Sequence, residues 1–586
     1  MNRDGAIRCR PCSFVLRKDN MKRFKEILRD PFSLLLFILP FIFGLYYEFA
    51  TYLAGAAMAL CLGVRIRKKK EVWASRAAAP VLMTAACLCY LIAAFYAVDR
   101  GMAVAGFFKM LPIPLFLLLL MQYSGKERAK LMEIIPYSAL GMTVLSAVLG
   151  LTEAFSAIFY SAGRLGGFFQ YSNTFALYLL LGVTVLLSVE TAFGKRFRIG
   201  GVFILLAGIL LTGSRSVFVL TAFTVLYFMI RQKSLRCPLL ILSGSLAVAA
   251  VILAFTTGYV ENFGRFLTIG LGESTFLGRF LYWKDGLGQI ARHPFGLGYM
   301  GYFYAQPSFQ TGVYTVRYIH NDFLQLALDA GIGALILWIT ALVISFVSKR
   351  TSPLQKRVLL LIVIGSLFDF HLQFLAVAMV LALAIDVGNP EKIGKPRFVK
   401  GSLAVSGTAC ILFCYLFTAF FMAYMNNQAL ALRLYPWNMD AQLEILNNGT
   451  AAGNLEDQTV TAERILKQNS HIAAAYEVKA AAAWKDRDYT AMTDLFEKAL
   501  ENEPYELEAY EGYLQMLSAA ITEESERENW AGVRLLAEKA LEVPQRLNAV
   551  IAQSDPIAYQ IDDKPELTLP SEYQIYLEKL KQAMKQ

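Results

Sequence analysis

Residues 102–121, MAVAGFFKMLPIPLFLLLLM, decide the fold class of this chain. The stretch carries one charged residue, Lys109, among otherwise apolar neighbours. A bilayer core of roughly 30 Å needs about twenty mainly apolar residues in a helix, so this stretch predicts a transmembrane helix. An ionisable side chain at that depth is costly and is a candidate functional residue by default, so Lys109 is a candidate for substrate binding.

Apolar stretches of this kind recur throughout the first 424 residues. Apolar residues occupy 56% of the 586 positions and charged residues only 17%, whereas a soluble domain carries about 25% charged residues. We therefore predict an all-α, polytopic membrane helical bundle of about thirteen transmembrane helices. The predicted spans are residues 32–47, 49–64, 80–98, 102–121, 132–151, 174–193, 199–213, 217–230, 238–256, 322–347, 358–368, 372–387 and 401–424. Asp369 and His371 separate two spans that would otherwise form one long helix.

Basic residues cluster in every second connection between these spans. The clusters lie at residues 17–25, 65–70, 126–130, 195–198, 231–236, 349–357 and 392–400. Because Lys and Arg are enriched in cytoplasmic loops, the N-terminus is predicted in the cytoplasm and the C-terminal segment outside the membrane. The predicted domains are a basic cytoplasmic N-terminus (1–30), a membrane domain (31–424) with a large outer loop (257–321) and an extracytoplasmic domain (425–586). The predicted location is the cytoplasmic membrane.

The segment after residue 425 is acidic and internally repetitive. It contains 27 Asp and Glu against 15 Lys and Arg. Residues 436–470, 471–504 and 505–544 align with one another and end in AERILKQNS, FEKALENEP and LAEKALEVP. Small residues in a first helix, followed by a second helix that ends at a proline, are typical of tetratricopeptide-like repeats. Such repeats bind partners or brace a neighbouring domain, so a protein partner is one expectation for this tail.

The outer loop 257–321 contains most of the residues that could bind or transform a substrate. Its motifs are GRFLYW (278–283), HPFGLGY (293–299) and YIHN (318–321). His320 would lie at the outer membrane face, just before the span 322–347. Asp329 follows nine residues later, roughly 13 Å along the helix. The sequence leaves two interpretations of His320 open, a polar helix cap at the interface or a catalytic side chain.

Arg215 lies on the outer side between the spans 199–213 and 217–230, in the sequence TGSRS (212–216). One interpretation is an interfacial anchor whose charge reaches lipid phosphates. The other is a binding residue for a phosphate group of a substrate in the membrane, because the guanidinium fork matches phosphate oxygens. The residues alone do not decide between the two.

The order of these elements resembles the O-antigen ligase and Wzy-type polymerase family. The resemblance covers roughly residues 30–390 and rests on Ser-Arg at 214–215, Gly-Arg-x-x-x-Trp at 278–283, His-Pro-x-Gly-x-Gly at 293–298 and His-Asn-x-x-Leu-x-x-x-x-Asp-x-Gly at 320–331. The stretch GGFFQYSN (166–173) resembles a further family element that ends at Asn173. The chain departs from the family pattern at Asp329, where Glu is common, in one span above the usual twelve, and in its repeat tail.

The resemblance implies glycan transfer outside the membrane, as a ligase or as a polymerase. The donor would be a saccharide on a polyprenyl diphosphate, and the acceptor a hydroxyl of a glycan, lipid or protein. His320 would act as general base, since histidine titrates near neutral pH, and Arg215 and Arg279 would stabilise the charged diphosphate leaving group. Candidate substrate-binding residues are Arg265, Arg292, Arg317, Asn173, Trp283, Tyr299, Asn321, Asp329 and Lys109. The aromatic candidates Trp283 and Tyr299 could stack on sugars or pack the loop.

Two other classes remain open at this point. A transporter or flippase of a lipid-linked saccharide would also have many spans, but it would place more charges near the bilayer midplane. A membrane scaffold would act through its repeat tail. No outer pair of carboxylates has metal-ligand spacing, so a metal-independent reaction without cofactors is expected. No nucleic-acid partner is expected.

Overall fold

The structure is a computed structural model that describes residues 24–189, 192–257, 272–452 and 455–585. It is nearly all helical, with two short two-stranded sheets in the described residues, which confirms the predicted all-α class. The chain divides into two compact units, which are described separately below. Unit 1 comprises Met1–Phe41 and Ser124–Gly258, and unit 2 comprises Ile42–Tyr123 and Tyr259–Gln586. The predicted candidate Arg265 and most of the basic N-terminus lie outside the described residues.

Several helices are long and apolar enough to cross a membrane. Within the described residues, five such stretches are Glu48–Lys69, Arg100–Met121, Gly125–Leu149, Asp322–Val347 and Pro396–Tyr424. Shorter apolar helices lie at Pro31–Phe41, Ala78–Ala93, Ser172–Ser188 and Leu375–Ala384. These helices support a membrane protein, and the count of about thirteen spans stays a prediction.

Unit 1 is built around helix α10 (Ser172–Ser188), which is buried along most of its length. Its neighbours are α8 (Ile134–Leu149), α11 (Lys195–Thr212) and α12 (Arg215–Arg231). The buried Arg198 of α11 donates through Nε to the carbonyl of Leu186 at 3.0 Å, which satisfies an end carbonyl of α10. The remaining elements are α2 (Pro31–Ile38), η1 (Leu39–Phe41), α7 (Gly125–Leu131), α9 (Glu153–Phe159), β2 (Tyr160–Ser161), β3 (Arg164–Leu165), η3 (Gly167–Phe169), η4 (Lys233–Leu235) and α13 (Arg236–Thr257).

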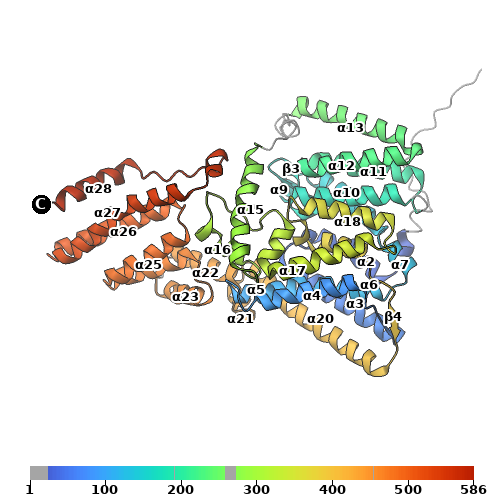
Figure 1. The fold of residues 1–586 in the computed structure, drawn as a ribbon, viewed down its shortest axis with the longest axis horizontal. Coiled ribbons are helices and arrows are strands. Elements are labelled where there is room, and N and C mark those ends of the chain that lie inside the picture. Colours follow the sequence, from blue (N-terminus) through green and yellow to red (C-terminus); the bar gives the residue numbers. More distant parts are fainter. Residues whose placement is uncertain (1–23, 190–191, 258–271, 453–454, 586) are drawn as a thin grey trace, which may run out of the picture. The chain divides into compact units, whose positions relative to one another are not determined.

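The membrane part of unit 2 contains two long helix pairs. Helix α20 (Pro396–Tyr424) packs along α3 (Glu48–Lys69), and α17 (Asp322–Val347) packs along α4 (Ala78–Ala93) (Figure 1). The opening stretch 102–121 forms two helices, α5 (Arg100–Met110) and α6 (Pro112–Met121), because Pro112 starts a new helix at its first position. The other elements are η2 (Phe43–Leu45), β1 (Val72–Ala74) paired antiparallel with β4 (Glu391–Ile393), α15 (Ser274–Arg292), α16 (Gly301–Phe309), α18 (Pro353–Ser366), η5 (His371–Gln373) and α19 (Leu375–Ala384).

Helix α17 is broken at Gly331, where two of the sequence motifs meet. The backbone of Gly331 has φ 86° and ψ 169°, which is not helical. The HPFGLG segment crosses it there: the Leu297 amide donates to the Leu328 carbonyl at 2.6 Å and the Ile332 amide to the Pro294 carbonyl at 3.0 Å. A Cβ on Gly331 would lie 2.6 Å from the Pro294 oxygen. This crossing therefore requires glycine at residue 331.

We expect Gly331→Ala to lower the free energy of unfolding by about 1–3 kcal/mol from backbone strain, with the collision against residue 294 added to that. The measurement is unfolding of the full-length protein in mixed micelles. Gly333→Ala is the matched control, since nothing lies within 4 Å of a Cβ there. Equal stability of the two variants would contradict the packing argument.

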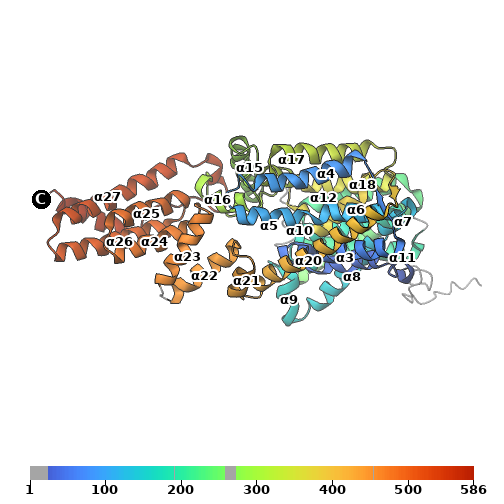
Figure 2. The same cartoon turned by 90° about the horizontal axis from the view of Figure 1, so that it is seen from below.

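The tail consists of stacked helix pairs (Figure 2). The helices are α21 (Gln428–Leu434), α22 (Met439–Ala452), α23 (Leu455–Gln468), α24 (Ala473–Lys485), α25 (Tyr489–Asn502), α26 (Leu507–Glu526), α27 (Trp530–Gln553) and α28 (Ser571–Ala583), with η6 (Pro556–Gln560) between the last two. Each predicted repeat contains one pair, namely α22 with α23, α24 with α25 and α26 with α27. Its assignment as tetratricopeptide-like stays a prediction.

One boundary in the tail was predicted wrongly. Pro544 was expected to end the third pair, but α27 continues through it to Gln553. A proline inside a helix removes one backbone hydrogen bond. The buried Val543 and Leu547 on either side pack into the tail core, which keeps the chain helical past that point.

Candidate active site

His320 lies immediately before α17 in an uncommon backbone conformation. Its φ is 52°, in the left-handed region, where residues other than glycine are rare and often functional. Its Nδ1 lies 3.2 Å from Oδ1 of Asp369, and its side chain is 20% exposed. Asp369 is buried in the short connection between α18 and α19. The ends of three helices, α17, α18 and α19, thus bring these two residues together.

Asp369 is shared between His320 and Arg279. Oδ2 of its carboxylate lies 3.6 Å from Nη2 of Arg279, a residue of α15. Burial opposes the charged form of Asp369, but the hydrogen bond from His320 and the charges of His320, His371 and Arg279 hold the pKa of this carboxyl well below its ordinary value. An ionised carboxylate only accepts hydrogen bonds, so Nδ1 of His320 carries the proton that faces it. In the neutral ring, Nε2 is then the acceptor.

The surroundings of this pair are aromatic and partly closed. The rings of Phe370 and Tyr282 lie 5.0 Å and 6.0 Å from the His320 ring. His371 is buried beside Asp369, and burial together with the charges of Arg279 and His320 lowers its pKa to about 4, against the opposing charge of Asp369. His371 is therefore neutral near pH 7, and His320 is the histidine of the site that keeps an exposed edge.

The connection between α16 and α17, residues 310–321, is called the His320 loop below. Side chains that the sequence predicts to bind substrate contact this loop. Nε1 of Trp283 donates to the Ile319 carbonyl at 2.9 Å, which favours the packing interpretation of this residue. The Ile319 amide donates to Gln325, whose Nε2 donates to Asp329 at 2.8 Å. Asp329 therefore acts on the loop through Gln325. Asn321 caps α17 by accepting from two backbone amides and donates to the Leu367 carbonyl at 3.0 Å.

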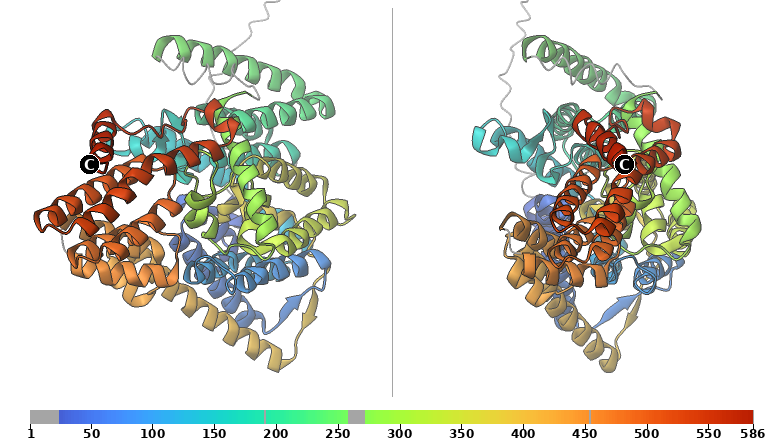
Figure 3. Two further views of the ribbon diagram at one scale, coloured as in Figure 1. Left: turned by 60° about the vertical axis from the view of Figure 1, so that its left-hand side comes forward. Right: turned by 90° about the vertical axis from the view of Figure 1, so that its left-hand side faces the viewer.

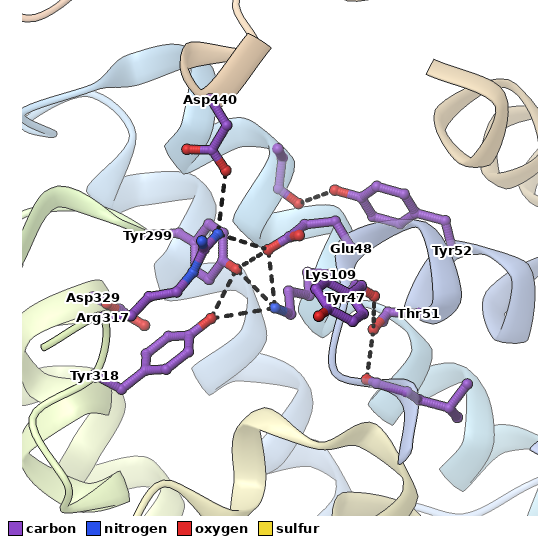
Figure 4. A network of polar contacts seen from close by, with 12 residues as sticks. Tyr47, Glu48, Thr51, Tyr52, Lys109, Tyr299, Arg317, Tyr318, Asp329 and Asp440 are labelled. Atoms are coloured by element: carbon purple, nitrogen blue, oxygen red, sulfur yellow. Dashed lines mark hydrogen bonds and ion pairs between the residues drawn. The ribbon is translucent and has the colours of Figure 1, made fainter. Parts of the chain in front are cut away.

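Lys109 is the centre of a buried polar network (Figure 4). Its Nζ lies 3.1 Å from Oε1 of Glu48 and donates to the hydroxyl of Tyr299 at 2.7 Å. The hydroxyl of Tyr318 lies 3.4 Å from the same nitrogen. Tyr299 also donates to Glu48 and is only 2% exposed, so its ring is packed inside unit 2. Lys109, the single charged residue of the apolar stretch 102–121, is thus paired with Glu48.

Arg317 extends this network toward the tail. Its Nη2 lies 3.9 Å from Oε1 of Glu48 and 3.3 Å from Oδ2 of Asp440. Arg317 precedes His320 by three residues, so the network and the His320 loop are continuous. Arg292 lies at the exposed end of α15.

Unit 1 holds a separate cluster around the predicted Arg215 and Asn173. Arg215 is the first residue of α12, and Asn173 is the second residue of α10. Arg164 joins their neighbourhoods, because its Nε donates to the Thr212 carbonyl at 2.9 Å and its Nη2 to Oδ1 of Asn173 at 2.7 Å. The GGFFQYSN and TGSRS elements of the sequence therefore meet through one arginine.

Sequence reasoning missed Asp369, Glu48, Asp440 and Arg164 as members of these clusters. Asp369 had a signal, since it interrupts the apolar run 358–387. Glu48 stands directly before the predicted span 49–64, where a charged residue is ordinary. Asp440 and Arg164 carry no local signal, because their partners lie far away or in another motif.

Comparison with protein-family models gives a match to part of the chain. Residues 200–339 match the family Wzy_C, described as O-Antigen ligase. The matched stretch includes Arg215, Arg279 and His320 and ends before Asp369. Neither a curated protein nor a solved structure matches the chain. The family match supports a glycan ligase or polymerase function for a glycosyl-transferring membrane enzyme.

Proposed function

We propose that this protein transfers a glycan from a polyprenyl-diphosphate donor to a hydroxyl acceptor. The observation that carries the proposal is the pairing of His320 with the buried carboxylate of Asp369. His320 lies inside the region that matches O-antigen ligases, and Asp369 lies outside that region in sequence but contacts His320. A base oriented by a carboxylate and left open on its second nitrogen is suited to take a proton from a hydroxyl group. The reaction is a ligase or a polymerase reaction depending on the acceptor.

The proposed step forms one bond, transfers one proton and breaks one bond. The acceptor oxygen forms a bond to the anomeric carbon of the donor, its proton passes to Nε2 of His320, and the bond from the anomeric carbon to the diphosphate oxygen breaks. The polyprenyl diphosphate leaves with the electron pair. Asp369 stays ionised and stabilises the imidazolium that forms.

Fixed cations stabilise the diphosphate as it leaves. Arg279 is the cation in contact with the His320 pair, and its side chain is 15% exposed. Arg215 keeps its proposed phosphate-binding role on the strength of its motif. Arg317 is paired with Glu48 and Asp440, so we assign it to the support of the His320 loop.

The proposed orientation places the site and the tail on the outer face of the cytoplasmic membrane. The alternating basic connections support it. His320 and Asp369 both belong to connections that this topology places outside, so their contact agrees with it.

The test is transfer by the purified protein in lipid vesicles, supplied with polyprenyl-diphosphate-linked saccharides extracted from its own source. We expect elongation or transfer of the glycan, and the product distinguishes polymerase from ligase. Movement of the lipid-linked saccharide across the bilayer without transfer would overturn the proposal in favour of a flippase.

The same assay tests the metal-independent form of the proposal. We expect full activity in excess chelator, because protein cations take the charge of the diphosphate. Loss of activity in chelator that added Mg²⁺ restores would contradict this expectation.

A further inference from the structure

The tail contacts the His320 loop through a charged residue. Oδ2 of Asp440, near the start of α22, pairs with Arg317 at 3.3 Å, and its Oδ1 accepts from the hydroxyl of Tyr304 at 2.6 Å. Tyr304 belongs to α16, and Arg317 lies in the connection between α16 and α17, three residues before His320. One tail carboxylate thus joins α16 to this connection.

Asp440 also balances the charge of the buried network. Lys109 and Arg317 are two cations that face one carboxylate, Glu48. With Asp440 the count is two against two. Lys109 and Glu48 are buried, whereas the side chains of Arg317 and Asp440 are 35% and 44% exposed, so water screens this outer pair. The tail therefore supplies one of the four charges of the network, at the side where the network reaches solvent.

A second tail segment, residues 555–561, holds α15. The Asp555 amide donates to the Thr311 carbonyl at 2.8 Å, and the Asp555 carboxylate pairs with Lys284 of α15. Figure 3 shows this red segment beside the light-green α15. The apolar side chains of Ala558 and Ile561 pack against Leu281. Leu281 follows Arg279 by two residues in α15. Residues 555–561 therefore contact the helix that carries Arg279, the arginine that pairs with Asp369.

A third contact reaches the helix that carries Lys109. The hydroxyl of Tyr435 donates to the Gly101 carbonyl at 2.7 Å, and Nε2 of Gln468 donates to Asp99 at 2.9 Å. Asp99 caps the start of α5. The tail therefore contacts α5, α15 and the His320 loop, which are the elements on which the site of unit 2 is built.

We propose that the tail is a fixed structural part of the active site, and that Asp440 and Asp555 are positioning residues for the reaction. This inference rests on the proposed function. Asp440 acts through Arg317 on the His320 loop, and Asp555 acts through Lys284 on α15. The tail holds the general base and its arginine partner in place, whatever else binds to its outer surface.

The first test compares Asp440→Asn with Asp440→Glu in the vesicle transfer assay. We expect Asp440→Asn to lower kcat per folded enzyme at least tenfold with little change in the donor KM, because the loop and not the donor site is disturbed. Asp440→Glu keeps the charge and is expected to lose less than threefold. The matched control is Asp494→Asn on the exposed face of α25, which should match wild type. Wild-type kcat in Asp440→Asn would overturn the proposal.

The second test does not depend on turnover. Hydrogen exchange of residues 310–321 in full-length protein should become faster in Asp440→Asn and stay unchanged in Asp494→Asn. Unchanged exchange in Asp440→Asn would overturn the proposal even if no transfer activity is found. If wild type transfers no glycan while exchange rises as expected, the proposed function fails and the structural part of the inference stands.

A third test uses an engineered disulfide between the tail and the His320 loop to determine whether the tail must move during turnover. A Cβ on Gly312 would lie 2.6 Å from Cβ of Ala558, so Gly312→Cys with Ala558→Cys places two cysteines close enough to be joined after a small shift. We expect the oxidised double variant to keep its transfer activity. Loss of activity on oxidation that a reductant restores would show a tail that has to leave its position, which contradicts a fixed brace.

Discussion

Asp369→Asn is expected to lower the rate of glycan transfer by about 10²–10⁴-fold, close to the loss in His320→Ala. The substitution keeps the size of the side chain and removes the charge. An asparagine can present its NH₂ group to Nδ1 of His320, which stabilises the tautomer with the proton on Nε2. That nitrogen then cannot accept the proton of the acceptor hydroxyl.

The measurement is the initial transfer rate per folded enzyme in lipid vesicles. His293→Ala is the matched histidine control, since this side chain is exposed at the end of α15, and it should leave the rate unchanged. Asp369→Asn at wild-type rate would refute the orienting role of the carboxylate. His320→Ala at wild-type rate would refute the general base itself.

Lys109→Met is expected to lower the free energy of unfolding by about 3–5 kcal/mol. The variant leaves the buried carboxylate of Glu48 with Arg317 at 3.9 Å as its remaining cation. Glu48→Gln alone should be similarly costly, because it leaves Lys109 without its counter-charge. The double variant removes one charge of each sign, so we expect it to regain more than half of the lost stability.

This cycle can be measured by titration with a denaturing detergent in mixed micelles. Lys68→Met, on the exposed end of α3, is the control and should change stability little. The result also separates two roles for Lys109. If Lys109→Met keeps full stability and loses transfer activity, the residue acts on substrate as its position in the sequence first suggested.

Local patterns in the sequence predicted most helices correctly, because a membrane helix is encoded by its own composition. Each predicted span contains a helix, and residues 358–387 divide into α18 and α19 where Asp369 and His371 interrupt the apolar run. The three tail repeats each contain one helix pair for a similar reason, since the small and large residues of a pair lie close in sequence. Pro544 is the exception, because packing on both sides overrides the break that proline favours.

The partners within the site could not be predicted in this way. Asp329 belongs to the same sequence motif as His320, yet a separation of nine residues along a helix keeps the two side chains apart. The observed partner, Asp369, lies 49 residues further along the chain, in a connection between two other helices. Only packing of α17 against α18 and η5 brings the two together. Charge partners such as Arg317 and Asp440 depend on tertiary structure in the same way.

The attachment of residue 555 to α15 has a consequence for biogenesis. Asp555 follows its partner Lys284 by 271 residues in the chain. At a synthesis rate of about 5–20 residues per second, α15 leaves the ribosome about 15–50 s before the segment that holds it. During that interval α15, which carries Arg279, lacks its contact with residue 555. The proposed brace would therefore complete the candidate site only after the end of the chain has been synthesised.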